Sequence, residues 1–270
     1  MEMKKNVFAL ALCAVLSLSL LSACGGKESA TIKVGASPTP HAQILEVAKE
    51  ILAKDNITLE IVPYDDYVLP NTNVEDGQLD ANYFQHITYM NNFNTNDGTH
   101  LVSVADLHYE PFGIYAGKSA SLDALPDGAQ IAIPDDPTNG GRALLLLQEQ
   151  GLIKLKDGVG LEPTVEDIAE NPHDYKIKQL TANLLTTTLQ DVDVAVINGN
   201  YAIGAGLKAS EALAIESADG IAGTAYVNVL AVKEGRENDE TIKALIKALT
   251  SDEVKAFIDE TYGGGVVAVF

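Results

Sequence analysis

The chain has 270 residues, 46% of them hydrophobic, and its formal net charge at pH 7 is −20. A chain of this length can bury one or two hydrophobic cores, and its strong negative charge argues against nucleic acid or an anionic lipid surface as a partner. The net charge does not restrict a small ligand, because a local site can differ from the surface as a whole.

The first residues have the layout of a secretory signal peptide. Two lysines precede an apolar run from Val7 to Leu21, which is only marginally long enough for a permanent membrane anchor. The last residues of this segment, LSAC, resemble the lipobox of bacterial lipoproteins, in which the cysteine is lipidated and becomes the first mature residue. We expect a signal peptide at 1–23, lipid on Cys24 and a polar tether at 24–30. Plain cleavage with an incidental cysteine is the alternative.

Cysteine usage fits an extracytoplasmic protein without internal disulfides. Cys13 leaves with the signal, so the mature chain keeps Cys24 alone. The mature part runs for 247 residues to Phe270 with a net charge of −21. It must be held together by its hydrophobic core.

After the tether, short β-branched runs alternate with helical patterns. Residues 31–36 and 57–64 predict strands, and residues 41–55 predict an amphipathic helix between them. Such a βαβ unit indicates a parallel sheet with helices on its faces. Further strands are expected in HLVSVADLHY (100–109), AQIAIP (129–134), YKIKQLT (175–181), VDVAVIN (192–198), ALAIES (212–217) and YVNVLAVKE (226–234), and helices after 136, at 201–208 and twice within 239–262, the last ending at Gly263 to Gly265.

This succession of elements fits two α/β lobes better than one large sheet. No flexible linker separates them, so the lobes must share connecting strands. We expect lobe one to comprise residues 31–114 plus 226–270, and lobe two to comprise 115–225.

Signatures of enzymes and metal sites are mostly missing. The sequence lacks G-x-S-x-G, H-E-x-x-H and G-x-x-x-x-G-K-[ST], and its five histidines do not have metal-ligand spacing. The adjacent pairs Asp65-Asp66 and Asp135-Asp136 are expected to be turn and capping residues, because neighbouring side chains point apart. We therefore expect no catalysis, no cofactor and no metal.

Two features are typical of a small-molecule binding site. Six aromatic residues lie between Tyr64 and Phe93, partly in the turn-rich segments DYVLPN and DGQLDANYFQH, where exposed rings more often line a site. For any single ring, the lobe core is the alternative. The other feature is Arg142, one of two arginines in the chain, which follows two glycines near the start of a helix, where the dipole disfavours a cation.

Several motifs together resemble one family. They are DYVLPN (66–71), DAN-x-FQH (80–86), DPTNGGRALLLLQ (136–148), GLIKLKDGVGLEPTVEDIAENP (151–172), AVIN (195–198) and YVN (226–228). In this order, from about Thr31 to Phe270, they resemble the methionine-binding lipoproteins of ABC importers, the NlpA lipoprotein family. One departure is the segment ANLLTTTLQDVD, which lacks the Pro-Arg pair usual in the family.

The resemblance implies a two-lobe, periplasmic-binding-protein-like α/β fold that closes around L-methionine and delivers it to a methionine permease. It implies a pocket in the cleft between the lobes. The side chain of the ligand would be held by Tyr67, Phe84 and His86, and its amino-acid backbone by Arg142, Asn198 and Asn228.

The chemistry of these residues suits a zwitterion. Gly140 and Gly141 leave N–H groups accessible at a helix start, and the fork of Arg142 can meet a carboxylate bidentately. A surface arginine is the alternative. Asn198 and Asn228 offer oxygen acceptors at the carboxyl ends of predicted strands, where open α/β sheets place ligands, although strand-end capping is the other interpretation of Asn198. Sulfur–aromatic contacts would favour a thioether.

The sequence therefore predicts an extracytoplasmic, lipid-anchored binding protein for L-methionine or a close analogue. Its expected partners are a methionine ABC permease with its ATPase and, through the lipid, the membrane; nucleic acid is not expected. Alternatives are the same scaffold with another amino acid, a D-enantiomer or a methionine-containing dipeptide, or a surface lipoprotein with a role in adhesion or interaction.

Overall fold

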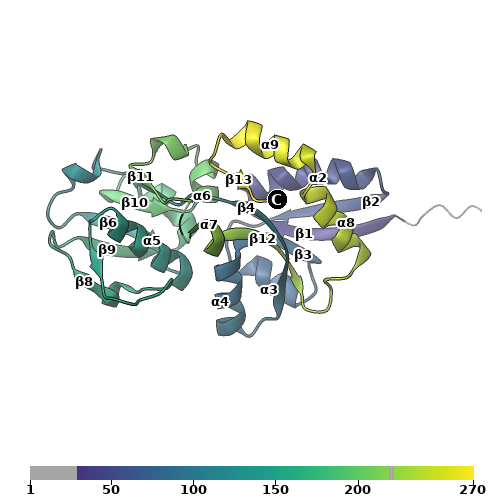
Figure 1. Cartoon of the computed structure of the whole chain (residues 1–270), viewed down its shortest axis with the longest axis horizontal. Helices are drawn as coiled ribbons and strands as arrows, with labels where there is room; N and C mark the ends of the chain where they lie inside the picture. The colour runs from purple at the N-terminus through teal and green to yellow at the C-terminus, as the bar shows by residue number, and fades with distance from the viewer. Residues whose placement is uncertain (1–28, 219, 221) are drawn as a thin grey trace, which may run out of the picture.

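The computed structural model describes residues 29–218, 220 and 222–270. The predicted signal peptide and Cys24 lie outside these residues. Among the described residues, no helix is long and apolar enough to cross a membrane. The described chain forms a six-stranded sheet, a five-stranded sheet and a two-stranded one, and the two large sheets lie side by side along the long axis of the molecule (Figure 1). We call the six-stranded sheet with its helices lobe one, and the five-stranded sheet with its helices lobe two.

The sheet of lobe one has the order β13-β4-β12-β3-β1-β2. β1 pairs in parallel with β2 and β3, which confirms the predicted βαβ unit, but β12 and β13 pair antiparallel with their neighbours. The expectation of a parallel sheet is therefore wrong for this half. β4 leads the chain out of lobe one and β12 brings it back, so these two strands run in opposite directions. The strands are β1 (Ala30–Ala36), β2 (Ile57–Pro63), β3 (Ala81–His86), β4 (Leu101–Tyr109), β12 (Val227–Lys233) and β13 (Val267–Ala268).

Helices cover both faces of this sheet (Figure 1). On one face α2 packs against α8 and α9, and on the other lie α3 and α4. The main core includes Val34, Leu45 and Leu245, all fully buried. Gly263 ends α9 in the left-handed conformation, as the sequence predicted. The helices are α2 (Gln43–Ala53), α3 (Leu69–Glu75), α4 (Ile87–Asp97), α8 (Glu240–Leu249) and α9 (Asp252–Tyr262), and a π-helical turn (Pro38–Ala42) precedes α2.

The sheet of lobe two has the order β11-β5-β10-β6-β9. β6 pairs in parallel with β9 and β10, whereas β5 pairs antiparallel with β10 and β11. Helix α5 buries its leucines against the sheet. The elements are β5 (Gly113–Ala116), β6 (Gln130–Pro134), α5 (Pro137–Glu149), β7 (Lys154–Leu155), β8 (Ile168–Glu170), β9 (Lys176–Leu180), β10 (Val194–Ile197), α6 (Gly199–Gly204) and β11 (Ala214–Ile215), with short 3-10 turns at Leu122–Ala124, Val165–Asp167, Ala182–Leu184, Thr186–Thr188 and Ala209–Glu211.

The chain passes between the lobes twice. It leaves between β4, which ends at Tyr109, and β5, which begins at Gly113. It returns between β11 and β12, a connection that includes α7 (Ala222–Ala225). The predicted lobe limit at 114/115 falls inside β5, and the domain limits as a whole stay predictions.

One predicted loop is a strand. The segment DGQLDANYFQH contains β3, whose six residues are all buried. The sequence pattern did not predict this strand because its polar residues do not alternate toward solvent. Asn82 and Gln85 are instead buried and form a closed set of amide hydrogen bonds with Asn71. The predicted helix at 201–208 is also displaced, since α6 begins at Gly199 and ends at Gly204.

The two acidic pairs contain a turn residue and a helix cap, as predicted. Asp66 accepts hydrogen bonds from the backbone N–H groups of Val68 and Leu69, both at 2.8 Å, at the start of α3. Asp136 is the N-cap of α5 and accepts from the N–H of Asn139 at 2.9 Å. This cap fixes the helix start that carries Arg142.

Candidate ligand-binding site

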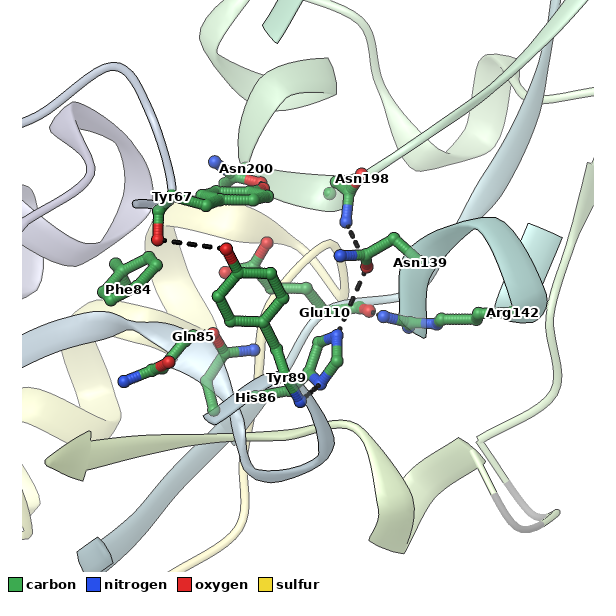
Figure 2. A pocket seen from close by; sticks show the side chains of 12 residues that line it. Tyr67, Phe84, Gln85, His86, Tyr89, Glu110, Asn139, Arg142, Asn198 and Asn200 are labelled. Atoms are coloured by element: carbon green, nitrogen blue, oxygen red, sulfur yellow. Dashed lines mark hydrogen bonds between the residues drawn. The ribbon is translucent and has the colours of Figure 1, made fainter. Parts of the chain in front are cut away.

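A cavity of about 350 Å³, partly open to solvent, lies between the two lobes, and we call it the interlobe cavity. Its walls come from β3 and α4 of lobe one, from α5 and the β10–α6 junction of lobe two, and from the crossing segments (Figure 2). All six predicted pocket residues line it. The lining residues are Tyr67, Phe84, Gln85, His86, Tyr89, Glu110, Asn139, Arg142, Asn198, Gly199, Asn200 and Asn228.

Aromatic rings form one wall of the interlobe cavity. The ring of Tyr67 lies 5.7 Å from the rings of both Phe84 and Tyr89, measured between centroids. Phe84 reaches the cavity because β3 presents alternate side chains to one face. Tyr83, one position earlier, packs in the main core of lobe one. The predicted aromatic segment therefore divides between the site and the core.

A chain of hydrogen bonds links the lobes across the cavity (Figure 2). The oxygen of the Asn139 amide lies 3.2 Å from His86 Nε2 and accepts from Asn198 Nδ2 at 2.8 Å. His86 Nδ1 accepts from the backbone N–H of Tyr89 at 3.0 Å, so Nε2 carries the proton. Burial, together with the nearby charge of Arg142, lowers the pKa of His86 to about 3. His86 is therefore a neutral donor at physiological pH.

Arg142 is buried and already has an acidic partner. Its Nε donates to Glu216 Oε2 at 2.9 Å, its Nη2 donates to Glu216 Oε1, and Nη2 also donates to the backbone oxygen of Glu110 at 2.9 Å. Its guanidinium carbon lies 4.2 Å from the ring centroid of Tyr226 and 4.7 Å from that of Phe112. The guanidinium fork is thus occupied by Glu216, which corrects the prediction that it is free for a ligand carboxylate. Among the described residues, Nη1 has no hydrogen-bond partner.

The two glycines before Arg142 serve close packing rather than anion binding. A Cβ on Gly140 would lie 3.0 Å from the oxygen of Pro134, and one on Gly141 would lie 2.7 Å from the Cα of Glu162. The N–H of Gly140 is bonded to the oxygen of Asp136 inside the helix. The prediction of an accessible N–H at this position is therefore wrong, because the helix is capped and already continuous there.

The two asparagines occupy different strand ends. Asn198 follows β10 and precedes α6, at the carboxyl end of the strand as predicted. Asn228 instead lies near the beginning of β12, where it is paired with His86 at the end of β3. The antiparallel course of β12 brings it to the cleft. The side-chain oxygen of Asn198 is buried and has no hydrogen-bond partner. Asn198 therefore lines the interlobe cavity with a free acceptor on its amide.

Behind the cavity lies a buried cluster of ionisable side chains. Glu110 Oε1 lies 2.8 Å from His108 Nε2 and 3.3 Å from His41 Nε2. Burial lowers the pKa of His41 to about 4 and that of His108 to about 3, so both are neutral N–H donors. Burial raises the pKa of Glu110, while His41 and Arg142 oppose that shift. His41, His108 and Glu110 also have the donor types of a three-ligand metal site, with their ligand atoms within 4.8 Å of one another.

Comparison with known proteins identifies the chain. The family model described as NlpA lipoprotein matches residues 32–270. The chain belongs to the NlpA lipoprotein family. The D-methionine-binding lipoprotein MetQ of Escherichia coli is 41% identical over 274 residues, which cover 99% of each chain. This confirms the family expected from the sequence motifs.

Solved structures show the same fold. A nutrient-binding protein from Burkholderia cenocepacia bound to methionine has a TM-score of 0.84 and 42% identity, covering 88% of this chain and 100% of the other. An ABC transporter periplasmic substrate-binding protein from Coxiella burnetii has a TM-score of 0.83 and 40% identity, covering 88% and 100%. The expected two-lobe α/β fold of a periplasmic binding protein is therefore confirmed for this NlpA-family chain.

Sequence reasoning missed part of the site of this NlpA-family chain. Tyr89 is one of the six aromatic residues between Tyr64 and Phe93, and nothing in its local sequence distinguishes it from the others. Asn139 sits in the quoted motif DPTNGG, where its position just before the glycines was a usable signal. No local signal marks Glu110 or Glu216 among the 38 acidic residues, because their partners are distant in sequence.

Proposed function

We propose that this chain is the extracytoplasmic, lipid-anchored substrate-binding component of an ABC importer. It binds L-methionine or a close analogue in the interlobe cavity and passes it to a methionine permease that is coupled to an ATPase. The observation that carries this proposal is the cavity itself, which is lined by aromatic rings, a buried arginine and the unpaired amide oxygen of Asn198. The named ligands of its relatives, methionine and D-methionine, support it.

In this proposal, Tyr67, Phe84 and His86 surround the thioether side chain. Arg142 meets the ligand carboxylate through Nη1, because its Nε and Nη2 are held by Glu216 and Glu110. Arg142 therefore offers one well-fixed donor instead of a bidentate fork. Asn198 and Asn228 face the amino group, and the unpaired oxygen of Asn198 is suited to it.

Native mass spectrometry of the protein as purified tests the proposal most directly. We expect a retained mass of methionine. The mass of another amino acid or of a methionine-containing dipeptide would replace methionine as the ligand. A protein that carries no ligand and binds no free amino acid in titration would favour the interaction role instead.

Competition titrations with amino acids test the side-chain wall. At about 0.8 kcal/mol per buried CH₂, plus a sulfur–aromatic contribution, methionine should bind on the order of a hundredfold more tightly than alanine. Norleucine should follow methionine closely, and glutamine should lie far behind because its amide would be left partly unpaired. The variant Phe84→Ala should flatten this order. Alanine or glutamine within a few-fold of methionine would contradict the aromatic wall.

A further inference from the structure

The interlobe cavity contains one acidic side chain that the proposed function leaves unused. Glu110 lines the cavity and is 6% exposed. Arg142, the basic residue of the lining, is paired with Glu216, so these two charges largely cancel. The charge of Glu110 therefore remains without a cation of its own among the described residues. A buried carboxylate in this situation is costly unless a cation meets it.

The groups around Glu110 fix its position without neutralising it. Its carboxylate accepts hydrogen bonds from His108 and from the backbone N–H of Asn200, and His41 Nε2 lies 3.3 Å from its Oε1. The hydroxyl of Tyr83 is hydrogen-bonded to Nδ1 of His108, which leaves Nε2 as the donor toward Glu110. All of these donors are uncharged. They favour the ionised carboxylate and leave its negative charge for another group.

Two other residues that line the cavity carry acceptor oxygens. Asn198 Oδ1 is buried and unpaired, and Asn198 is 6% exposed. Asn228 Oδ1 lies 3.0 Å from His41 Nε2 and keeps a second lone pair. An ammonium group has three N–H donors, and a carboxylate with two amide oxygens matches that number. No described cavity-lining residue supplies a cation that could meet these acceptors.

The opposite charges of the site are joined through one residue. The backbone oxygen of Glu110 accepts from Arg142, and its side chain extends toward Asn200 on the other side of the cavity (Figure 2). The receptor for a carboxylate and the receptor for an ammonium group are thus fixed relative to each other by Glu110 itself. This arrangement matches an α-amino acid, in which the two charges are one carbon apart.

We propose that Glu110 is the ammonium receptor of the site and makes a free, charged amino group a requirement for binding. His41 and His108 are positioning residues that hold its carboxylate. This inference rests on the proposed function, whose ligand it narrows to compounds with an unmodified amino group. N-acylated amino acids and hydroxy acids are then excluded even when they carry the methionine side chain.

A two-ligand titration tests the assignment. The ligands are methionine and its 2-hydroxy analogue, in which a hydroxyl replaces the ammonium group. The wild type should bind methionine at least a hundredfold more tightly. Glu110→Gln, which keeps the size and one accepting oxygen and removes the charge, should weaken methionine about thirtyfold or more and the hydroxy analogue less than threefold. The discrimination between the two ligands should therefore nearly disappear.

Glu216→Gln is the matched control, because it removes a buried carboxylate that pairs with Arg142 rather than with the proposed ammonium site. It should weaken the binding of both ligands by the same factor and leave the ratio of their affinities unchanged. His108→Gln should reduce the ratio less than Glu110→Gln does. Circular dichroism and thermal unfolding of each variant report whether it is folded.

Three outcomes overturn the inference. They are equal weakening of both ligands by Glu110→Gln, methionine affinity of that variant within threefold of wild type, and loss of discrimination in Glu216→Gln as well. A wild-type protein that does not bind methionine at all rejects the proposed function instead. If Glu110→Gln is unfolded, Glu110→Asp takes its place. The side chain of Asp is one methylene shorter, so its charge lies farther from the ligand. This variant should reduce the ratio of methionine affinity to hydroxy-analogue affinity at least tenfold, and an unchanged ratio overturns the inference.

Discussion

Arg142 and Glu216 depend on each other for their burial. Both are nearly inaccessible to solvent, and Glu216 also accepts from the hydroxyl of Tyr109 at 2.6 Å and from the N–H of Phe112 at 3.2 Å. The unusual position of Arg142 could be noticed from the sequence, but its partner could not. The two residues are 74 positions apart, and the segment around Glu216 has no motif that distinguishes it from other acidic residues.

We predict that Arg142→Ala weakens methionine binding and also destabilises the fold. Removing one member of a buried ion pair leaves the other unpaired, which costs about 3–5 kcal/mol of unfolding free energy. Loss of a buried charged contact to the ligand should weaken its affinity about thirtyfold or more. Denaturant unfolding and calorimetric titration measure the two effects. Affinity within threefold of wild type would remove Arg142 from the site.

The double variant Arg142→Met/Glu216→Gln separates the two effects. The amide oxygen of Gln can still accept from Tyr109 and Phe112, while no unpaired charge remains buried. We expect it to recover at least half of the stability lost in Arg142→Ala, with no recovery of methionine affinity. A double variant as unstable as the single one would show that the ion pair does not control the stability.

At the level of elements, the start of α6 organises the acidic side of the site. Asn198 is its N-cap, Gly199 is its first residue, and Asn200 supplies a backbone donor to Glu110. A Cβ on Gly199 would lie 2.8 Å from the Cβ of Glu110 and 2.9 Å from its Oε2. Glycine is therefore required here by the close approach of the Glu110 side chain.

Gly199→Ala should consequently displace Glu110 and damage both stability and binding. We expect a loss of about 1–3 kcal/mol in unfolding free energy and methionine binding about tenfold weaker or more. The matched control is Gly204→Ala at the other end of the same helix, where a Cβ meets nothing within 4 Å. It should change the unfolding free energy by less than about 1 kcal/mol. Equal effects of the two variants would argue against the contact with Glu110.

Elements with simple patterns could be predicted, and elements with buried polar groups could not. β1, α2 and β2 follow from alternating or amphipathic runs and are found where they were expected. β3 was missed because its buried Asn82 and Gln85 satisfy each other and Asn71. The direction of β12 also depends on the passage of the chain through lobe two. No local pattern contains that information.

At the scale of the whole molecule, the lobes are held together at the cleft by polar contacts. Tyr67 donates from its hydroxyl to Asn200 at 2.6 Å, Tyr201 donates to the oxygen of Asp65 at 2.9 Å, and His86 meets Asn139. The sequence could predict which residues meet at the cavity, because the family motifs carry them. It placed His86 at the cavity, but it could not predict that His41 and His108 lie behind it or that burial keeps all three histidines neutral.

These histidines make stability depend on pH. Burial lowers the pKa of His41 to about 4 and those of His86 and His108 to about 3, while an unfolded histidine titrates near 6.5. Below pH 6.5 the unfolded chain therefore binds more protons than the folded protein, and folding is disfavoured as the pH falls. Each histidine should cost about 2 kcal/mol of unfolding free energy at pH 5 relative to pH 7. The raised pKa of Glu110 and that of Asp136, both due to burial, act with the opposite sign.

One substitution isolates the contribution of a single histidine. His86→Asn removes the titrating ring and keeps an acceptor that can cap α4 at Tyr89, which is the role His86 Nδ1 has now. We expect the stability difference between pH 7 and pH 5 to be about 2 kcal/mol smaller in this variant than in wild type, because one fewer group takes up a proton on unfolding. Urea unfolding of the ligand-free protein at both pH values gives this difference, and the acidic groups cancel in the comparison. Glu75, whose pKa is lowered to about 2 by the backbone N–H of His100, loses its contribution only below this range. If wild type and variant show the same pH dependence, His86 is already charged in the folded protein, and its neutral role in the chain from Tyr89 to Asn139 is wrong.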